Sequence, residues 1–400
     1  MTDPHTDSIG DELPSATPRL HDRHGLGLTL FGGGARAAYQ VGVLRGLSHA
    51  HPNLEIPFIT GISAGAINAA HLSSRIGTFR ERTESLEQLW RAIDVDRVFE
   101  TQGLPLLYRT ACIAMRLAIG WAPTLDPLLG MVNAAPLSAF LEGALGSRDL
   151  PGIDANLASG QLKAVALIAL KYSTSQTISF CMGEEIIDWE RPLRRSQRGR
   201  LTIDHILASA ALPLFFPPVE IDGEWYGDGG IRLTAPLAPA IHLGADRLLA
   251  ISTRYRPSGK EADRPRFDGP PRAAQVLGSL MGATFLDVLD QDADQLDRIN
   301  DLLEKLPPES RGALRPLRSL IIRPSEDIAR LANDFEPRLP WTFRFLTRRW
   351  GTRKSRSQEL LSTILFQEDY VRLLMEIGER DGVAHSDALS ELIDAPAITS

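Results

Sequence analysis

The sequence is poor in cysteine and lacks both long apolar runs and an excess of positive charge. Its 400 residues contain two cysteines, Cys112 and Cys181, too few for a disulfide framework or a cysteine-based metal cluster. We expect both to be core residues. The net charge of -7 disfavours nucleic acid as a partner. No stretch reaches the ~18 uninterrupted apolar residues of a membrane span, and no secretory signal is visible.

A glycine triplet follows the first apolar run. Residues 26–31 predict a buried strand, residues 37–47 predict a helix, and Gly32-Gly33-Gly34-Ala35-Arg36 joins them. Such a loop offers backbone N–H groups to an anion. Because neither G-x-G-x-x-G nor a Walker lysine is present, nucleotide binding is disfavoured. Two interpretations remain, an oxyanion hole and a simple packing turn, although three glycines exceed what a turn needs.

A second segment, Gly61-Ile62-Ser63-Ala64-Gly65, lies between an apolar run and a helix-like stretch. Strand, sharp turn and helix form the context that a G-x-S-x-G nucleophile elbow requires. The serine hydroxyl would then stand at the carboxyl edge of a sheet, over a helix N-terminus that favours negative charge. The alternative is a tight turn that holds a serine by chance.

A third segment ends in Gly227-Asp228-Gly229-Gly230. Before it, residues 201–211 predict a helix, and Asp222-Gly223 predicts the turn of a short hairpin. Taken alone, an aspartate between glycines indicates an Asx turn.

The three segments together, in this order, resemble the patatin-like phospholipase family. Residues 208–218, 235–237 and 243–246 also look like blocks of that family, so the resemblance covers about residues 25–253. Two departures are visible: Ala37 and Phe31 stand where many members have glycine. Neither removes a backbone N–H, so neither argues against activity.

The resemblance implies a three-layer α/β/α fold with a mostly parallel central sheet, and a Ser–Asp dyad. Ser63 would be the nucleophile and Asp228 the general base, with a pKa raised by burial. The implied oxyanion donors are Gly32, Gly33, Gly34 and Ala64, and the residues that shape the motifs are Gly61, Gly65, Arg36, Gly229 and Gly230. Arg36 would fix the loop or meet a phosphate head group, unless it is a surface arginine.

The implied function is hydrolysis of carboxylic esters in lipids, of the phospholipase A or lysophospholipase type, with no metal or organic cofactor. Three alternatives stay open. One is a neutral-lipid or short-chain esterase or thioesterase on the same fold. Another is a Ser-Asp-His triad, since His242 follows Asp228, although His242 and His205 both fall in predicted helices. The third is a non-catalytic lipid-binding protein.

We expect a disordered leader over residues 1–24, a catalytic domain over 25–260, a helical extension over 261–385 packed on or beside it, and a tail over 386–400. The apolar stretch 104–132 and the basic, aromatic stretch 341–356 predict either contact with an anionic membrane or ordinary core and surface helices. Because neither a secretory signal nor a membrane span is visible, we expect a cytoplasmic protein, with peripheral membrane association as the alternative.

Overall fold

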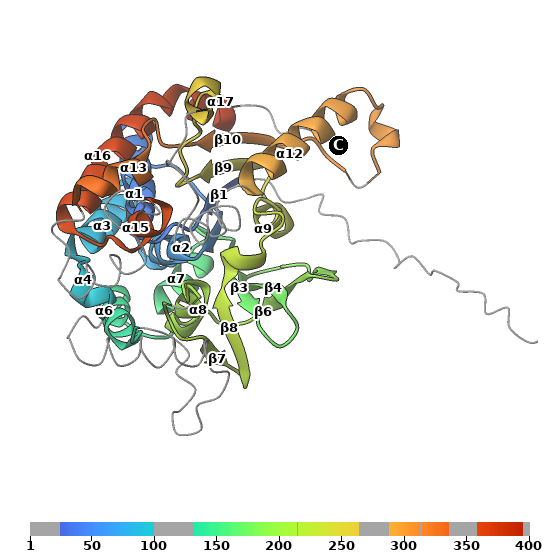
Figure 1. Cartoon of the computed structure of the whole chain (residues 1–400). Coiled ribbons are helices and arrows are strands. Elements are labelled where there is room, and N and C mark those ends of the chain that lie inside the picture. Colours follow the sequence, from blue (N-terminus) through green and yellow to red (C-terminus); the bar gives the residue numbers. More distant parts are fainter. Residues whose placement is uncertain are drawn as a thin grey trace, which may run out of the picture.

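The computed structural model describes residues 25–99, 132–213, 215–263, 288–312, 314–335 and 358–394, and within them one ten-stranded sheet forms the middle layer (Figure 1). The strands are β1 (Leu26–Leu30), β2 (Phe58–Ile62), β3 (Ala164–Lys171), β4 (Gln176–Gly183), β5 (Glu190–Arg191), β6 (Arg194–Arg198), β7 (Val219–Ile221), β8 (Glu224–Asp228), β9 (Arg247–Ile251) and β10 (Arg318–Ile322). The helices are η1 (Gly34–Ala37), α1 (Ala38–Ala50), α2 (Ala64–Ser74), α3 (Phe79–Ala92), α4 (Val95–Val98), α6 (Ala135–Leu145), α7 (Pro151–Ala158), α8 (Ile203–Ser209), η2 (Gly229–Arg232), α9 (Ala238–Leu243), α10 (Gly259–Ala262), α12 (Val288–Glu304), η3 (Pro308–Ser310), α13 (Ile328–Phe335), α15 (Gln358–Ile364), α16 (Glu368–Ala384) and α17 (Ser386–Asp394).

The main path of the sheet has the order β10-β9-β1-β2-β3-β4-β6-β5. The five strands from β10 to β3 run parallel, as the βαβ connections between them require. Antiparallel pairing begins at β4, and β8 pairs antiparallel with both β3 and β7. The predicted mostly parallel central sheet is therefore confirmed.

Side chains alternate between two cores along each central strand, because successive residues of a strand point to opposite faces. On β3, Val165 and Leu167 join the larger core, whereas Ala166 and Ile168 join the smaller one. Helices α1, α2, α3 and α16 cover the first face, and α9 and α12 lie on the other (Figure 1). This arrangement gives the predicted three layers.

The sheet extends past the predicted boundary at residue 260. Strand β10 pairs in parallel with β9 over its whole length, from Arg318 beside Arg247 to Ile322 beside Ile251. A strand of the predicted C-terminal extension thus completes the edge of the central sheet. Local patterning could not reveal this, because strand pairing is a long-range contact.

The C-terminal end of the chain contains more helix than expected. Helices α15 and α16 of the predicted extension are separated by residues 365–367. The expected tail begins with a helix, α17, whose Leu389 and Leu392 are buried. Apolar residues at helical spacing explain why this segment is folded.

Helices α1 and α16 pack with their backbones nearly in contact through two pairs of glycines. A Cβ atom on Gly42 would lie 2.0 Å from the Met375 carbonyl oxygen, and one on Gly378 would lie 2.1 Å from the Tyr39 oxygen. Gly46 and Gly382 repeat the arrangement one helical turn later. Small residues four apart allow such an approach, which joins the C-terminal helix to the first helix of the fold.

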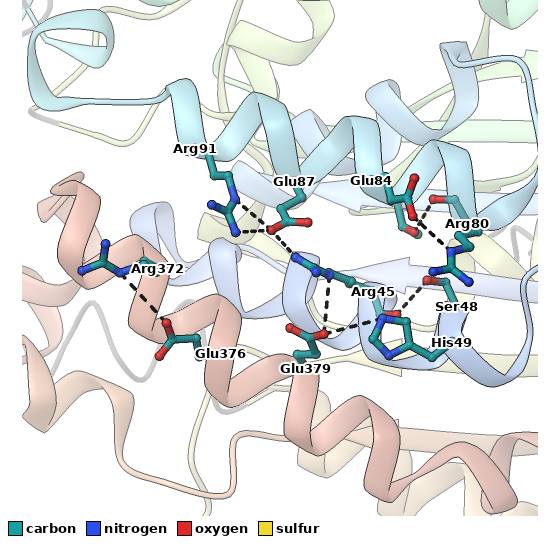
Figure 2. A network of polar contacts seen from close by, with 11 residues as sticks. Arg45, Ser48, His49, Arg80, Glu84, Glu87, Arg91, Arg372, Glu376 and Glu379 are labelled. Carbon is teal, nitrogen blue, oxygen red and sulfur yellow. Dashed lines mark hydrogen bonds and ion pairs between the residues drawn. The ribbon is translucent and has the colours of Figure 1, made fainter.

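Polar contacts flank this helix pair (Figure 2). Arg45 of α1 forms ion pairs with Glu87 of α3 and with Glu379 of α16, while His49 lies 3.6 Å from the same Glu379 carboxylate. Glu87 also binds Arg91 along α3. Three helices are thereby tied together around one arginine. Because Arg45, His49 and Glu379 are partly exposed, the glycine packing is expected to contribute more to stability than these ion pairs.

Replacing Gly378 by alanine is expected to destabilise the fold by about 1–3 kcal/mol, because the new methyl group would collide with backbone rather than with a movable side chain. Gly143 is the matched control, since it is an exposed glycine of α6 where an added Cβ atom would have nothing within 4 Å. Gly143→Ala should leave the melting temperature unchanged or raise it. Equal melting temperatures for the two variants would contradict the packing account.

Several expectations fall on residues outside the described ranges. These are the leader over residues 1–24, the apolar stretch 104–132 except Val132, the basic stretch 341–356, and Cys112. Cys181 is buried as expected. Among the described residues, no helix combines the length and apolarity needed to cross a membrane.

Candidate active site

Ser63 occupies a strained turn between β2 and α2. Its backbone angles are φ 55° and ψ -130°, which non-glycine residues rarely adopt. The flanking glycines are required by close contacts: a Cβ atom on Gly61 would lie 2.5 Å from the Ala69 Cβ, and one on Gly65 would lie 2.2 Å from the Leu30 oxygen. This is the geometry expected of a nucleophile elbow.

A second serine holds this turn in place. The Ser63 backbone N–H donates to Ser209 Oγ at 3.0 Å, and the Ser209 hydroxyl donates to the Ile168 carbonyl at 2.5 Å. Ser209 is fully buried at the end of α8. It belongs to a family-like block of the sequence, but no role was predicted for it. This hydrogen bond offsets part of the cost of the strained turn, because it gives the buried Ser63 N–H an acceptor.

Sheet register explains how Asp228 reaches Ser63 from 165 residues away in the chain. Strand β3 pairs with β2 as far as Ile168, which lies beside Ile62. The next residue of β3, Ala169, pairs with Asp228 of β8. Because β4 occupies the other edge of β3 along its whole length, β8 must continue the line of β2. Asp228 therefore follows Ile62 at the point where the chain turns at Ser63.

Asp228 is fully buried. Its Oδ1 accepts a hydrogen bond from the Gly230 N–H at 2.8 Å, and its Oδ2 has no partner with full hydrogen-bond geometry among the residues described. Burial raises the pKa of Asp228 to about 7, while the Ser63 hydroxyl and the Gly230 N–H each act to lower it. Gly229 has no room for a side chain, since a Cβ atom would lie 2.1 Å from the Ile168 oxygen. The Asp-Gly-Gly segment thus aims one carboxylate oxygen toward Ser63.

The glycine loop lies against Ser63 on another side. A Cβ atom on Gly32 would be 2.7 Å from the Ser63 Cβ, so only glycine fits there. The Gly32 carbonyl is turned away by a 2.5 Å hydrogen bond from Thr253 Oγ1. Gln40 donates to the preceding Phe31 carbonyl at 2.7 Å. Sequence reasoning missed Thr253 and Gln40, because they bind backbone atoms rather than substrate.

Two helix beginnings meet at the serine. Gly34 is the first residue of η1, and Ala64 is the first residue of α2. The first N–H groups of a helix have no acceptor within the helix, so both can serve an outside anion. Gly33, Gly34 and Ala64 line the same pocket as Ser63.

That pocket encloses about 860 Å³ of empty space, including the part open to solvent. Its walls are mainly apolar and come from α2, α4, α6, the end of α8 and α15. The apolar lining residues are Ile67, Ile93, Val98, Phe99, Leu137, Leu212, Phe215, Phe216, Leu360, Ile364 and Phe366. Such a cavity suits a hydrocarbon chain reaching Ser63.

Arg36 lines this pocket as well and is only 3% exposed, so it is not a surface arginine. Its guanidinium donates to Glu359 Oε2 at 2.7 Å and to Thr363 Oγ1 at 3.4 Å. Both partners belong to α15, which also lies against the glycine loop: a Cβ atom on Gly34 would be 2.0 Å from the Thr363 oxygen. Sequence reasoning did not predict that Glu359 and Thr363 belong to the site.

Neither histidine considered for a triad lines the Ser63 pocket. His242 stacks on Trp189 with ring centroids 4.8 Å apart, and burial lowers its pKa to about 4. His205 Nδ1 accepts a hydrogen bond from the Thr202 N–H at the start of α8. Both lie in helices, as the sequence predicted, and both have structural contacts that explain them.

Comparison with known proteins gives relatives of low identity. An uncharacterized NTE family protein of Mycobacterium tuberculosis (strain H37Rv) and its counterpart in Mycobacterium bovis are each 27% identical over 271 residues, covering 68% of this chain and 58% of theirs. The chain thus spans a little over half the length of these relatives.

Among solved structures, human GIVD cytosolic phospholipase A2 aligns with 92% of this chain and 62% of its own, at 12% identity and a TM-score of 0.45. VipD from Legionella pneumophila aligns with 88% of this chain and 67% of its own, at 13% identity and a TM-score of 0.35. The model of the patatin-like phospholipase family matches residues 28–241, more than half of the chain, and includes both Ser63 and Asp228. The chain belongs to the patatin-like phospholipase family.

Proposed function

We propose that the protein is a lipid acyl hydrolase that cleaves carboxylic esters through a Ser63–Asp228 dyad. The observation that carries this proposal is a fully buried carboxylate beside a strained serine at the wall of an apolar pocket. Family membership supports a lipid ester as the substrate.

In the proposed reaction, Ser63 Oγ attacks the ester carbonyl as its proton passes to Asp228 Oδ2. The tetrahedral intermediate collapses, Asp228 returns the proton to the departing alkoxide, and an acyl-enzyme remains on Ser63. Water then attacks the acyl-enzyme as its proton passes to Asp228. The second intermediate collapses, Asp228 returns the proton to Ser63 Oγ, and the fatty acid leaves. A pKa of about 7 suits both roles, because the carboxylate is then a stronger base than ordinary aspartate yet is ionised near neutral pH.

The negative charge of the intermediate would be held by N–H groups of Gly33, Gly34 and Ala64. Gly34 and Ala64 are the first residues of η1 and α2, and Gly33 directly precedes η1. The N–H donors and the helix dipoles therefore act on the same charge. Gly32 would contribute mainly by allowing the loop to approach Ser63. Losing one oxyanion donor typically lowers kcat by about 10²–10³-fold.

We expect wild-type protein to hydrolyse p-nitrophenyl esters, with kcat/KM rising from acetate through butyrate to octanoate, because longer chains bury more apolar surface in the pocket. Ser63→Ala, checked for folding, is the control and should be inactive. Phospholipid vesicles and monoacylglycerol micelles then distinguish a phospholipase or lysophospholipase from a neutral-lipid esterase. Inactivity of folded wild type on all of these substrates would favour a non-catalytic lipid-binding role instead.

A further inference from the structure

Among the described residues that line the Ser63 pocket, Arg36 is the one with a positively charged side chain, and a residue outside the matched family region forms an ion pair with it. Among the pocket-lining residues that the structure describes, Arg36 and Glu359 are the two whose side chains are charged at neutral pH. Their charges cancel, so the described pocket wall carries no net charge. Glu359 lies on α15, 323 residues after its partner.

The pair is held in a setting that favours a strong interaction. The Arg36 side chain is 4% exposed and the Glu359 side chain 24% exposed, with 2.7 Å between Nη1 and Oε2. In such a poorly hydrated site, opposite charges attract strongly, and an unpaired charge is unfavourable. An anionic group of a substrate could bind Arg36 in only two ways. It would have to displace Glu359, or it would have to lie close to the Glu359 carboxylate, which has the same charge.

Displacement is opposed by the packing of α15. The Thr363 carbonyl is so close to Gly34 that a Cβ atom there would be 2.0 Å away. Leu361 and Ile364 of the same helix are buried in the larger core. Moving Glu359 with its helix would therefore disturb the glycine loop beside Ser63.

We infer that Glu359 is a specificity-determining residue that neutralises Arg36, so that the site selects uncharged acyl esters over esters with an anionic group near the scissile bond. This inference rests on the proposed function, because it concerns the same pocket and the same nucleophile. It names the substrate class as neutral glycerides or similar uncharged esters. An enzyme for phosphate-bearing lipids would instead leave this arginine available.

The test compares two substrates with the same oleoyl chain and the same ester, monooleoylglycerol and oleoyl lysophosphatidic acid, each dispersed in the same neutral detergent. Release of oleate gives kcat/KM for each. We expect wild type to prefer the neutral substrate by about tenfold or more, and Glu359→Gln to lower that preference about tenfold by leaving Arg36 unneutralised.

Two variants serve as controls. Glu368→Gln makes the same charge change at an exposed position at the start of α16 and should retain the wild-type preference. The double variant Arg36→Gln with Glu359→Gln again leaves the pocket without net charge and should restore the preference for the neutral ester, whatever its rate.

Three results would overturn the inference. The first is folded wild type that cleaves both lipids equally well. This result needs no variant, so it holds even if Glu359→Gln fails to fold. The second is an equal substrate preference in Glu359→Gln and Glu368→Gln. Wild type that cleaves neither lipid, nor any p-nitrophenyl ester, would overturn the proposed function and this inference with it.

Discussion

Asp228→Asn is expected to lower kcat for ester hydrolysis by about 10²–10⁴-fold, the range that a positioned general base contributes. Asparagine keeps the shape of the side chain and can still accept the Gly230 N–H at Oδ1. It cannot accept the proton of Ser63. The loss would therefore report on chemistry rather than on folding, and initial rates with p-nitrophenyl octanoate measure it.

Asp292→Asn is a matched control for this experiment. Asp292 is also a largely buried aspartate whose pKa is raised by burial, and it accepts a hydrogen bond from the Leu237 N–H. It does not line the Ser63 pocket. We expect this variant to keep kcat within a few fold of wild type. A similar loss in both variants would indicate a structural effect and would count against the dyad.

The pH profile gives the same hypothesis a second test. Asp228 must be ionised to act as a base, and burial raises its pKa to about 7. Activity should therefore fall about tenfold for each pH unit below 7. An aspartate with an ordinary pKa would leave activity nearly constant from pH 6 to pH 8.

Asp228→Asn is also expected to stabilise the protein relative to wild type at pH 8 but not at pH 4. The pKa of Asp228 is about 7 in the folded protein and near its ordinary value of 3.8 in the unfolded chain. Below pH 3.8 both states hold the proton, and the group has no effect on the free energy of unfolding. Between 3.8 and about 7 the unfolded chain loses the proton while the folded protein keeps it, so stability falls as pH rises.

Above pH 7 the wild type carries the full cost of a buried charge, on the order of 4 kcal/mol. Asparagine avoids this cost at every pH. The melting temperature of the variant minus that of wild type should therefore increase between pH 4 and pH 8, as measured by differential scanning calorimetry. A difference that does not change with pH would show that Asp228 has an ordinary pKa. Asp292→Asn, with a less buried carboxyl, should show a smaller change.

This opposition between activity and stability follows from how the site is built. The strained φ of Ser63 and the buried carboxylate of Asp228 both raise the free energy of the folded state. Ser209 and Gly230 offset part of that cost with hydrogen bonds to each residue. The remaining stabilisation comes from the central strands β1, β2 and β3, because their buried side chains fill both cores.

Motif order and local patterning predicted the elements that carry Ser63, Asp228 and the glycine loop. Each is a short-range signal: a strand, a turn that demands glycine, and a helix. The contact between Ser63 and Asp228 came only from family resemblance, since it depends on the register of β8 against β3. No local pattern encodes that register.

The C-terminal half of the pocket escaped prediction for the same reason. Glu359 and Thr363 lie in a short helix whose composition gives no sign of a site, and they meet Arg36 across more than 300 residues of chain. The packing of α16 on α1 was not predicted either, although the sequence carries a signal for it. Gly42 and Gly46, and likewise Gly378 and Gly382, show the four-residue spacing that permits close helix contact.

The central claim is that Ser63 becomes acylated with the help of Asp228. Its most direct test is intact-mass analysis after reaction with an alkyl fluorophosphonate, followed by peptide mapping of wild type, Ser63→Ala and Asp228→Asn. We predict one adduct on Ser63 in wild type, none in Ser63→Ala, and labelling at least about 10²-fold slower in Asp228→Asn. Folded wild type that takes up no adduct, or takes it up at another residue, would contradict the account.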